Sequence, residues 1–338
     1  MEKQLFSNES KKLAILLVVF FSIFVLSVAS AAPVQSSSPK APYAYITNDG
    51  SNNVSVIDTS TSSVIATVDV GSSPEGVMVT RDGTKVYVAN EGSNTVSVID
   101  TATKEVTETL NVGFCPAGVA VTPDGTKVYV TNSGDNNVSV INTAINRVTT
   151  AVNVSGEPEG VAINPTGTKA YVAIYDTNNV TVIDTATNTV TATVNVGLGP
   201  KGVAVTPSGK KIYVTNQESV SVSVIDAATN TVTATVVVGS TPWEVAVTPD
   251  GTKVYVANEG SCSVSVIDTS TNTVTATVPI GSNPIGVAIT PDGTKVYVTN
   301  PGDNTIVIID TAKNTVTSTL KVGNMPFALG EFIGGPAA

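Results

Sequence analysis

The sequence predicts an all-β fold, a seven-bladed β-propeller with four antiparallel strands in each blade. A tyrosine-centred motif recurs at a constant step of 42 residues, as from Tyr45 to Tyr87, and no insertion interrupts the series. Each unit also holds four short segments rich in β-branched residues, separated by turn residues. Units of about 40 to 45 residues with four strands are typical of propeller blades. The motif occurs at Tyr45, Tyr87, Tyr129, Tyr171, Tyr213, Tyr255 and Tyr297.

The four expected strands of a unit follow in a fixed order: "GVAVT", "KVYVTN", "NVSVIDT" and "TVTATVNV". The "TPDG" between the first two has proline and glycine where a type I turn favours them. The acid of "IDT" precedes a short reversal and is expected to accept hydrogen bonds there, as in an Asx-turn. One unit has Asn142 at this position, so the role needs no charge. The tyrosines, flanked by valines, are expected to pack between blades.

These motifs resemble the YVTN-repeat family of β-propellers, which are frequent in archaeal surface-layer and other secreted proteins. The resemblance rests on the "YVTN" core, the "TPDGTKVYVTN" run and the "SVIDTATN" turn, and it extends from about Tyr43 to Ile333. Seven copies in phase make it specific for the fold and much less so for function, because propellers serve as binding modules, scaffolds and enzymes. It implies an extracellular or cell-surface location.

The end of the chain is expected to close the ring. The first blade begins at "APYAYITN" with its second strand and has no first strand before it. The tail "MPFALGEFI" matches the missing piece, with Pro326 aligned to Pro284, Pro242 and Pro200. The last strand should therefore complete the first blade, which would remove the open strand edges that invite aggregation.

The N-terminus has a different composition. Two lysines precede an uncharged apolar run from Leu13 to Val28, and Ala29-Ser30-Ala31 follows it. This pattern predicts a secretory signal peptide over residues 1–31, with an uncleaved membrane anchor as the alternative. Residues 32–42 are rich in Ser and Pro and are expected to form a tether. The propeller would span 43–333, and 334–338 would be a flexible tail.

The net charge of the chain and its expected location limit the classes of partner. The formal net charge of -10 disfavours nucleic acid, because no basic patch could replace its counterions. A cell-envelope protein or glycan is the expected kind of partner, and contact with a membrane is expected only through the N-terminal segment if it stays uncleaved. No cofactor is expected. The protein is expected to be secreted or attached to the cell surface.

One face of the disc should carry a ring of acids, because the loop between the second and third strands of every blade contains one. We consider two interpretations: a surface that attracts cations, or polar turn residues that keep the protein soluble. No metal site is predicted, since one acid per blade does not bring together the oxygen ligands that calcium needs. The acids are Asp49, Glu91, Asp135, Asp176, Glu218, Glu259 and Asp303.

The residue after the inter-blade proline differs from blade to blade and should lie at the mouth of the central channel. We call these residues the rim: Glu75, Ala117, Glu159, Lys201, Trp243, Ile285 and Phe327. An asymmetric rim with a Trp, a Lys and two acids is typical of a ligand-binding site, although drift at exposed positions would give the same pattern. In blade four, Ile174 stands where the six other blades have asparagine at the end of the second strand, and Tyr175 follows it. They either extend this patch or reflect a variation in packing.

The chain has no histidine, which removes the usual general base and metal ligand. With short and equal loops, this predicts that the protein is not an enzyme and that no residue is catalytic. The sequence instead predicts a binding or envelope module that presents a propeller face to a protein, glycan or ion. A purely structural surface-layer component is the first alternative. A lactonase-like hydrolase that uses Glu75 and Glu159 is the second.

Two remaining sets of residues concern modification. Cys115 and Cys262 should lie on opposite sides of the ring, too far apart for a disulfide, which leaves free thiols or pairing with another chain. Four sequons within the expected propeller predict glycosylation if the protein is secreted. They begin at Asn53, Asn137, Asn153 and Asn179.

Overall fold

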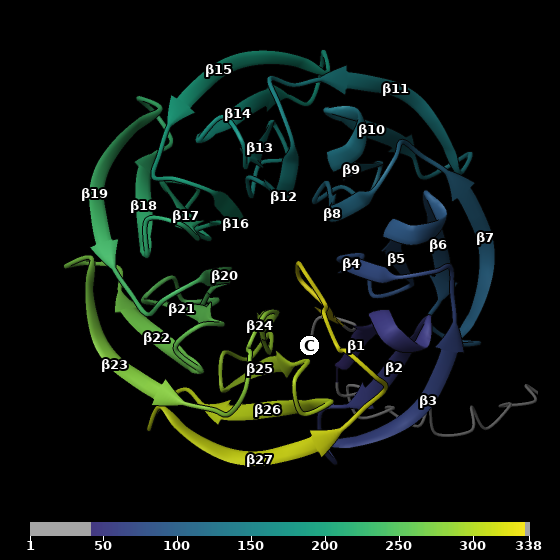
Figure 1. Cartoon of the computed structure of the whole chain (residues 1–338). Coiled ribbons are helices and arrows are strands. Elements are labelled where there is room, and N and C mark those ends of the chain that lie inside the picture. The colour runs from purple at the N-terminus through teal and green to yellow at the C-terminus, as the bar shows by residue number, and fades with distance from the viewer. Residues whose placement is uncertain (1–41, 335–338) are drawn as a thin grey trace, which may run out of the picture. The chain divides into compact units, whose positions relative to one another are not determined.

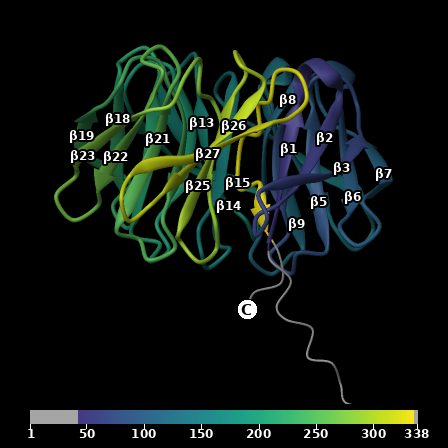
Figure 2. The same ribbon diagram turned by 90° about the horizontal axis from the view of Figure 1, so that it is seen from below.

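The computed structural model describes residues 42–334, which form a single ring of seven four-stranded antiparallel sheets. The predicted seven-bladed propeller is confirmed (Figure 1). The expected signal peptide or anchor, the tether up to residue 41 and the tail from residue 335 lie outside the described residues. Within 42–334, no helix has the length and apolar character needed to cross a membrane. Figure 2 shows the blades on edge, with their strands crossing the ring from one face to the other.

Blade one consists of β28, β1, β2 and β3, and blades two to seven take the following strands in groups of four. The innermost strands line the channel. They are β28 (Ile333–Gly334), β4 (Pro74–Val79), β8 (Pro116–Val121), β12 (Pro158–Ile163), β16 (Pro200–Val205), β20 (Pro242–Val247) and β24 (Val287–Ile289). The second strands carry the tyrosines. They are β1 (Tyr43–Asn48), β5 (Lys85–Asn90), β9 (Lys127–Asn132), β13 (Lys169–Ile174), β17 (Lys211–Asn216), β21 (Lys253–Asn258) and β25 (Lys295–Asn300).

The third strands complete the buried part of each blade. They are β2 (Asn53–Asp58), β6 (Thr95–Asp100), β10 (Asn137–Asn142), β14 (Asn179–Asp184), β18 (Ser221–Asp226), β22 (Ser263–Asp268) and β26 (Thr305–Asp310). The fourth strands form the outer wall. They are β3 (Ser63–Asp69), β7 (Glu105–Asn111), β11 (Arg147–Asn153), β15 (Thr189–Asn195), β19 (Thr231–Val237), β23 (Thr273–Pro279) and β27 (Thr315–Lys321). Three single-turn 3-10 helices lie in the loops of blades one to three: η1 (Asp49–Ser51), η2 (Glu91–Ser93) and η3 (Ser133–Asp135).

The repeated tyrosines pack between blades, as predicted. All seven are at most 1% exposed, and several reach the next blade. The hydroxyl of Tyr129 donates a hydrogen bond to Oδ1 of Asn188 at 2.7 Å, and that of Tyr255 donates to Asn314 at 2.9 Å. The tyrosines therefore supply both apolar area and polar contacts at the blade interfaces.

The acids of the "IDT" motif accept hydrogen bonds from backbone N–H groups in their turns. Oδ1 of Asp226 takes bonds from the N–H groups of Ala228 (3.0 Å) and Thr229 (2.9 Å). The amide oxygen of Asn142 does the same in blade three. The prediction of a turn acceptor that needs no charge is thus confirmed.

The C-terminal strand closes the ring, but with a different register from that of the repeat. Pro326 bridges Asn48, as the alignment predicts. The repeat would then place Glu331 opposite Ala44, by analogy with Val205 and Ile212 in blade five, whereas Ala44 pairs with Ile333. Two residues are accommodated where Ala328 (φ 53°) and Gly330 (φ 103°) adopt left-handed conformations.

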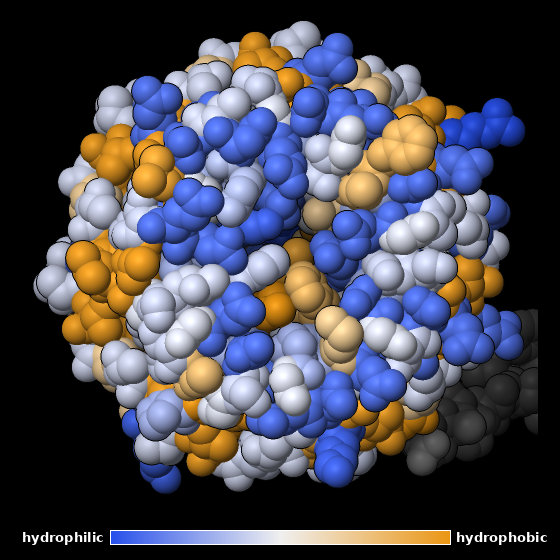
Figure 3. All heavy atoms as spheres, in the orientation of Figure 1, coloured by the Kyte–Doolittle hydropathy of each residue, from blue (hydrophilic) through white to orange (hydrophobic). Residues whose placement is uncertain are grey.

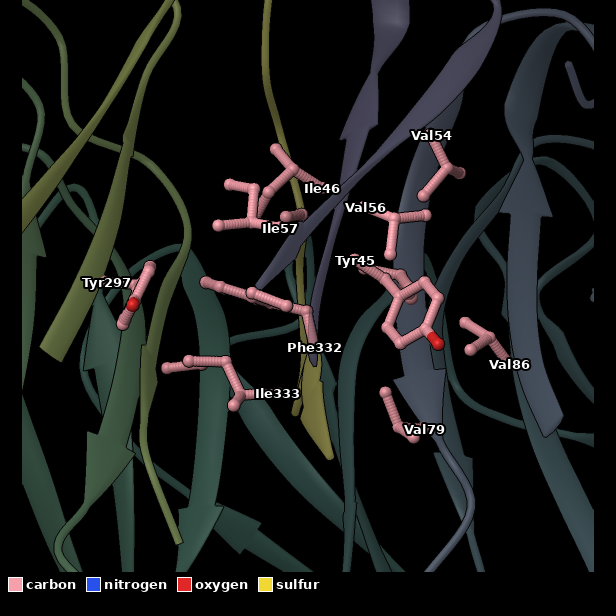
Figure 4. Packing of buried hydrophobic residues seen from close by; sticks show 14 of the residues in the cluster. Tyr45, Ile46, Val54, Val56, Ile57, Val79, Val86, Tyr297, Phe332 and Ile333 are labelled. Carbon is pink, nitrogen blue, oxygen red and sulfur yellow. The ribbon is translucent and has the colours of Figure 1, made fainter. Parts of the chain in front are cut away.

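Between these two pairings the closing segment lies against β4 of blade two. The N–H of Leu329 donates to the carbonyl oxygen of Glu75 (3.2 Å), and the N–H of Val77 donates to the carbonyl oxygen of Leu329 (2.8 Å). Phe332 is fully buried among the residues of this junction, between Tyr45 and Tyr297 (Figure 4). The C-terminal segment thus joins blades one and two in addition to completing blade one.

Candidate functional site

The rim residues surround one mouth of the central channel, on the face that carries the loops between second and third strands. Figure 3 shows this face, which is mostly hydrophilic, with hydrophobic surface visible in the hollow at its centre. Ala117 and Ile285 are buried and add no polar side chain. Four other rim residues meet in one cluster with Tyr175 of blade four. This rim cluster consists of Glu159, Lys201, Trp243, Phe327 and Tyr175.

Lys201 lies at the centre of the rim cluster. Its ammonium donates a 2.6 Å hydrogen bond to Oε1 of Glu159 in the preceding blade. The same nitrogen lies 4.5 Å from the ring centroid of Tyr175 and 4.8 Å from that of Trp243, within the range of cation–π attraction. The side chains of the ion pair are only 14% and 10% exposed, so water screens the pair weakly and the lysine is held in one orientation.

Loop acids hold the two aromatic rings that flank Lys201. The indole N–H of Trp243 donates to Oε2 of Glu259 at 2.7 Å, and the hydroxyl of Tyr175 donates to Oε1 of Glu218 at 2.9 Å. The hydrogen bond to Glu218 also raises the pKa of the Tyr175 hydroxyl. Phe327 packs edge-to-face on Trp243, with ring centroids 5.6 Å apart. The ring positions are thus fixed before any ligand arrives.

Glu75 lies near the rim cluster without forming an ion pair in the described part of the chain. Burial, together with the charges of Glu91 and Glu159, raises its pKa to about 8, while Lys201 opposes the shift. Burial also raises the pKa of Glu159, against the charge and hydrogen bond of Lys201. The mouth therefore holds one carboxyl that can keep its proton near neutral pH and a second one paired with an ammonium.

Most of the loop acids accept local hydrogen bonds. Besides Glu218 and Glu259, Asp135 and Asp176 accept hydrogen bonds from the backbone N–H groups of Phe114 and Glu157, both at 2.9 Å. Asp303 accepts a long one from Ser282. Among residues 42–334, no group of three or more acidic, cysteine or histidine side chains is arranged to hold a metal ion. These contacts favour a local structural role for five of the loop acids. Asp49 and Glu91 make no such contact in the described region.

The two unusual residues of blade four have different environments. Ile174 is fully buried and represents a variation in packing, whereas Tyr175 belongs to the rim cluster.

Among the sequons, Asn179 is 5% exposed and its amide nitrogen donates to Thr177, which disfavours glycosylation there. Asn53 and Asn137 accept hydrogen bonds from neighbouring Asn side chains, and Asn153 is exposed. Cys115 and Cys262 are free thiols.

Below the rim, the inner strands line a cavity of about 580 Å³. Its walls are mostly Val, Ala and Ile side chains of the inner strands, and Glu244 and Glu331 add carboxyl groups. We did not predict either residue as part of a site. Glu244 has a signal in the sequence, because it stands where five blades have glycine and blade one has Ala328. Glu331 has one too, because the alignment from Pro326 places it where the six other blades have Val or Ile.

Comparison with known proteins supports the propeller fold. The family model of the YNCE-like beta-propeller matches residues 24–126. No curated protein sequence matches the chain. Hydrazine synthase from Kuenenia stuttgartiensis is similar in structure, with a TM-score of 0.70, 25% identity, and coverage of 75% of this chain and 87% of that one.

Two further solved structures are similar over nearly their whole length. One is a functionally unknown protein from Desulfotomaculum acetoxidans, with a TM-score of 0.78, 17% identity, and coverage of 88% of this chain and 100% of that one. The other, from Bacteroides uniformis, is described as a "putative 6-phosphogluconolactonase", with a TM-score of 0.74, 17% identity, and coverage of 85% and 98%.

These matches overturn the prediction that the chain is not an enzyme. Propellers with the names of enzymes share its architecture, so short loops and a lack of histidine do not separate it from that class. The prediction gave too much weight to histidine, since carboxyl groups with raised pKa values, such as Glu75, can also transfer protons.

Proposed function

We propose that this propeller recognises a saccharide or sugar-derived ligand at the rim cluster. The observation that carries the proposal is the position of Lys201, which is held by Glu159 and by the faces of Tyr175 and Trp243. Binding sites commonly place a few oriented polar groups on an apolar surface. This mouth has both, and no other position of the rim holds a basic residue.

The chemistry of the rim cluster favours a sugar over the other ligand classes. Trp243 and Phe327 are partly exposed and offer flat apolar contact for the C–H face of a pyranose ring. Glu75 and Glu159 can accept hydrogen bonds from hydroxyl groups, and Lys201 can donate one. The net charge of -10 opposes a strongly anionic ligand. With the secretory segment expected at the N-terminus, a glycan of the cell envelope is the proposed natural ligand and the cell surface the proposed location.

The fluorescence of Trp243, the only tryptophan in the chain, provides the test. We expect a saturable change on titration with an oligosaccharide from a panel of neutral, N-acetylated and uronic acid oligomers. Lys201→Met should weaken this binding at least about tenfold, because it removes a charge-assisted hydrogen bond. Glu108→Gln, on an exposed outer strand, is the matched control and should bind as the wild type does. No response to any oligomer, or equal binding by Lys201→Met, would refute the proposal.

A second candidate function is the hydrolysis of a sugar lactone. The favouring observation is Glu75, whose pKa of about 8 suits a general acid or base at neutral pH, beside the pair of Glu159 and Lys201. The lactonase name of one similar structure motivates the choice of substrate. Purified protein would be assayed with glucono-δ-lactone and 6-phosphogluconolactone in a pH-stat. A rate above the spontaneous one that Glu75→Gln abolishes would support this function, and a rate equal to the spontaneous one would reject it.

A further inference from the structure

The central cavity shares no lining residue with the rim cluster, and its defining polar group is Glu244. This side chain lines the cavity and is 6% exposed. Oε1 accepts a 3.2 Å hydrogen bond from the N–H of its neighbour Val245, and no other residue within 42–334 donates to the carboxyl group. A buried carboxyl with so few donors is costly unless something else satisfies it.

The residue at position 244 also changes the packing of the blades. At the equivalent glycines of other blades, an added Cβ atom would collide with the backbone of the next blade, for example at 2.0 Å from the Ala117 carbonyl oxygen for Gly76 and at 2.4 Å from that of Lys201 for Gly160. In the next blade, β24 begins only at Val287, whereas the repeat places its start at Pro284. The glutamate thus coincides with a shortened inner strand in blade seven.

We propose that the central cavity binds a small primary amine with an apolar stem, whose ammonium group pairs with Glu244. The ammonium would supply the donors and the positive charge that the carboxyl lacks, and the stem would lie against Val203, Ala204 and Val245, which line the same cavity. The volume of about 580 Å³ falls within the range of small-molecule sites. Glu331 adds a second acid to the walls and Arg81 one base, so the acids outnumber the base.

Other ligand classes fit the cavity less well. An organic anion would meet two carboxyl groups on apolar walls. A divalent cation needs several oxygen ligands in one place, and residues 42–334 offer no such group. Burial raises the pKa of Glu244 to about 8. An ammonium group would stabilise the ionised carboxylate, whereas a neutral alcohol could only form a hydrogen bond to it. A primary amine fits better than these three classes, because its ammonium group can pair with the carboxyl group and its apolar stem can pack against the walls.

Isothermal titration calorimetry of the full chain with hexylamine at pH 7 tests the proposal. Hexanol, hexanoate and calcium serve as comparison ligands. We expect saturable binding of hexylamine and binding at least about tenfold weaker for hexanol, because the charge-assisted bond is lost. Absence of hexylamine binding, or equal binding of hexanol, would overturn the proposal.

Two variants assign the binding to Glu244. Glu244→Gly introduces the residue found at this position in five blades and should fold, as a circular dichroism melt would verify. Glu244→Gln retains the shape of the side chain, so it tests the same assignment if the glycine variant does not fold. Both should bind hexylamine at least about tenfold more weakly, while Glu108→Gln, which removes an exposed acid outside the cavity, should bind normally. Unchanged affinity in the Glu244 variants would refute the assignment.

Discussion

The rings of Trp243 and Phe327 form a T-shaped contact across an intervening blade. Their centroids are 5.6 Å apart and their planes lie at 88°, although Trp243 belongs to blade six and Phe327 to the segment that closes blade one. Ile285, the rim residue of blade seven, is buried. The two rings therefore converge over the mouth of the channel instead of staying with their own blades.

Removal of Lys201 should destabilise the protein, because Glu159 would be left buried without a counter-ion. Lys201→Met is expected to cost about 3 kcal/mol in the free energy of unfolding, at the lower end of the range for breaking a buried pair. The double variant Glu159→Gln/Lys201→Met should recover much of this loss. Denaturation in guanidinium chloride measures both. Additive effects of the two substitutions would show that the ion pair does not couple these residues.

The pKa of Glu75 predicts a dependence of stability on pH. Its pKa rises from 4.5 to about 8 on folding, so between these values the unfolded chain releases a proton that the folded chain retains. Stability should therefore fall as the pH rises through this window. Glu75→Gln removes this contribution and should melt close to the wild type at pH 4.5 but above it at pH 8. Melting temperatures that stay equal at both pH values would contradict the prediction.

Removal of the closing segment should open the ring. Deletion of residues 324–338 eliminates β28 and the fully buried Phe332, exposes the edge of β1 and removes the contacts with β4. We expect aggregation or a large drop in melting temperature, measured by light scattering and thermal denaturation. Deletion of residues 335–338, which leaves β28 intact, is the control. A shortened chain that melts like the full one would show that closure is dispensable.

The turn acids should tolerate the loss of charge but not the loss of the acceptor. Asp226→Asn keeps an oxygen for the N–H groups of Ala228 and Thr229, as Asn142 does in blade three. It should melt near the wild type, whereas Asp226→Ala should melt at a lower temperature. Differential scanning calorimetry at pH 7 compares them. Equal losses in the two variants would indicate that the charge matters after all.

The 42-residue repeat was sufficient to predict the number of blades, the strand order and the closure, because a uniform repeat forces uniform packing. The same regularity identified the rim positions, since residues in one register lie at one height in the channel. The side-chain hydrogen bonds around the rim were not predictable. The hydrogen bonds from Tyr175 to Glu218 and from Trp243 to Glu259 depend on side-chain reach, which the repeat does not encode.

The closing segment is where reasoning from the repeat was least accurate. Pro326 lies where the alignment places it, but Ala328 and Gly330 turn the chain and shift the register of all that follows. Phe332 consequently enters the core. Glu244 is visible in the sequence as a departure from glycine, but it directly follows the variable rim residue and was not predicted as part of a site.

The pairing of Tyr43 with Gly334 places the two ends of the described propeller on neighbouring strands. Joined by a short linker, these ends would make the ring continuous, and a new start could then be cut in a loop of any other blade. Such a circular permutant should have the same fold. It would allow the rim cluster to be fused next to a chosen partner without altering its residues.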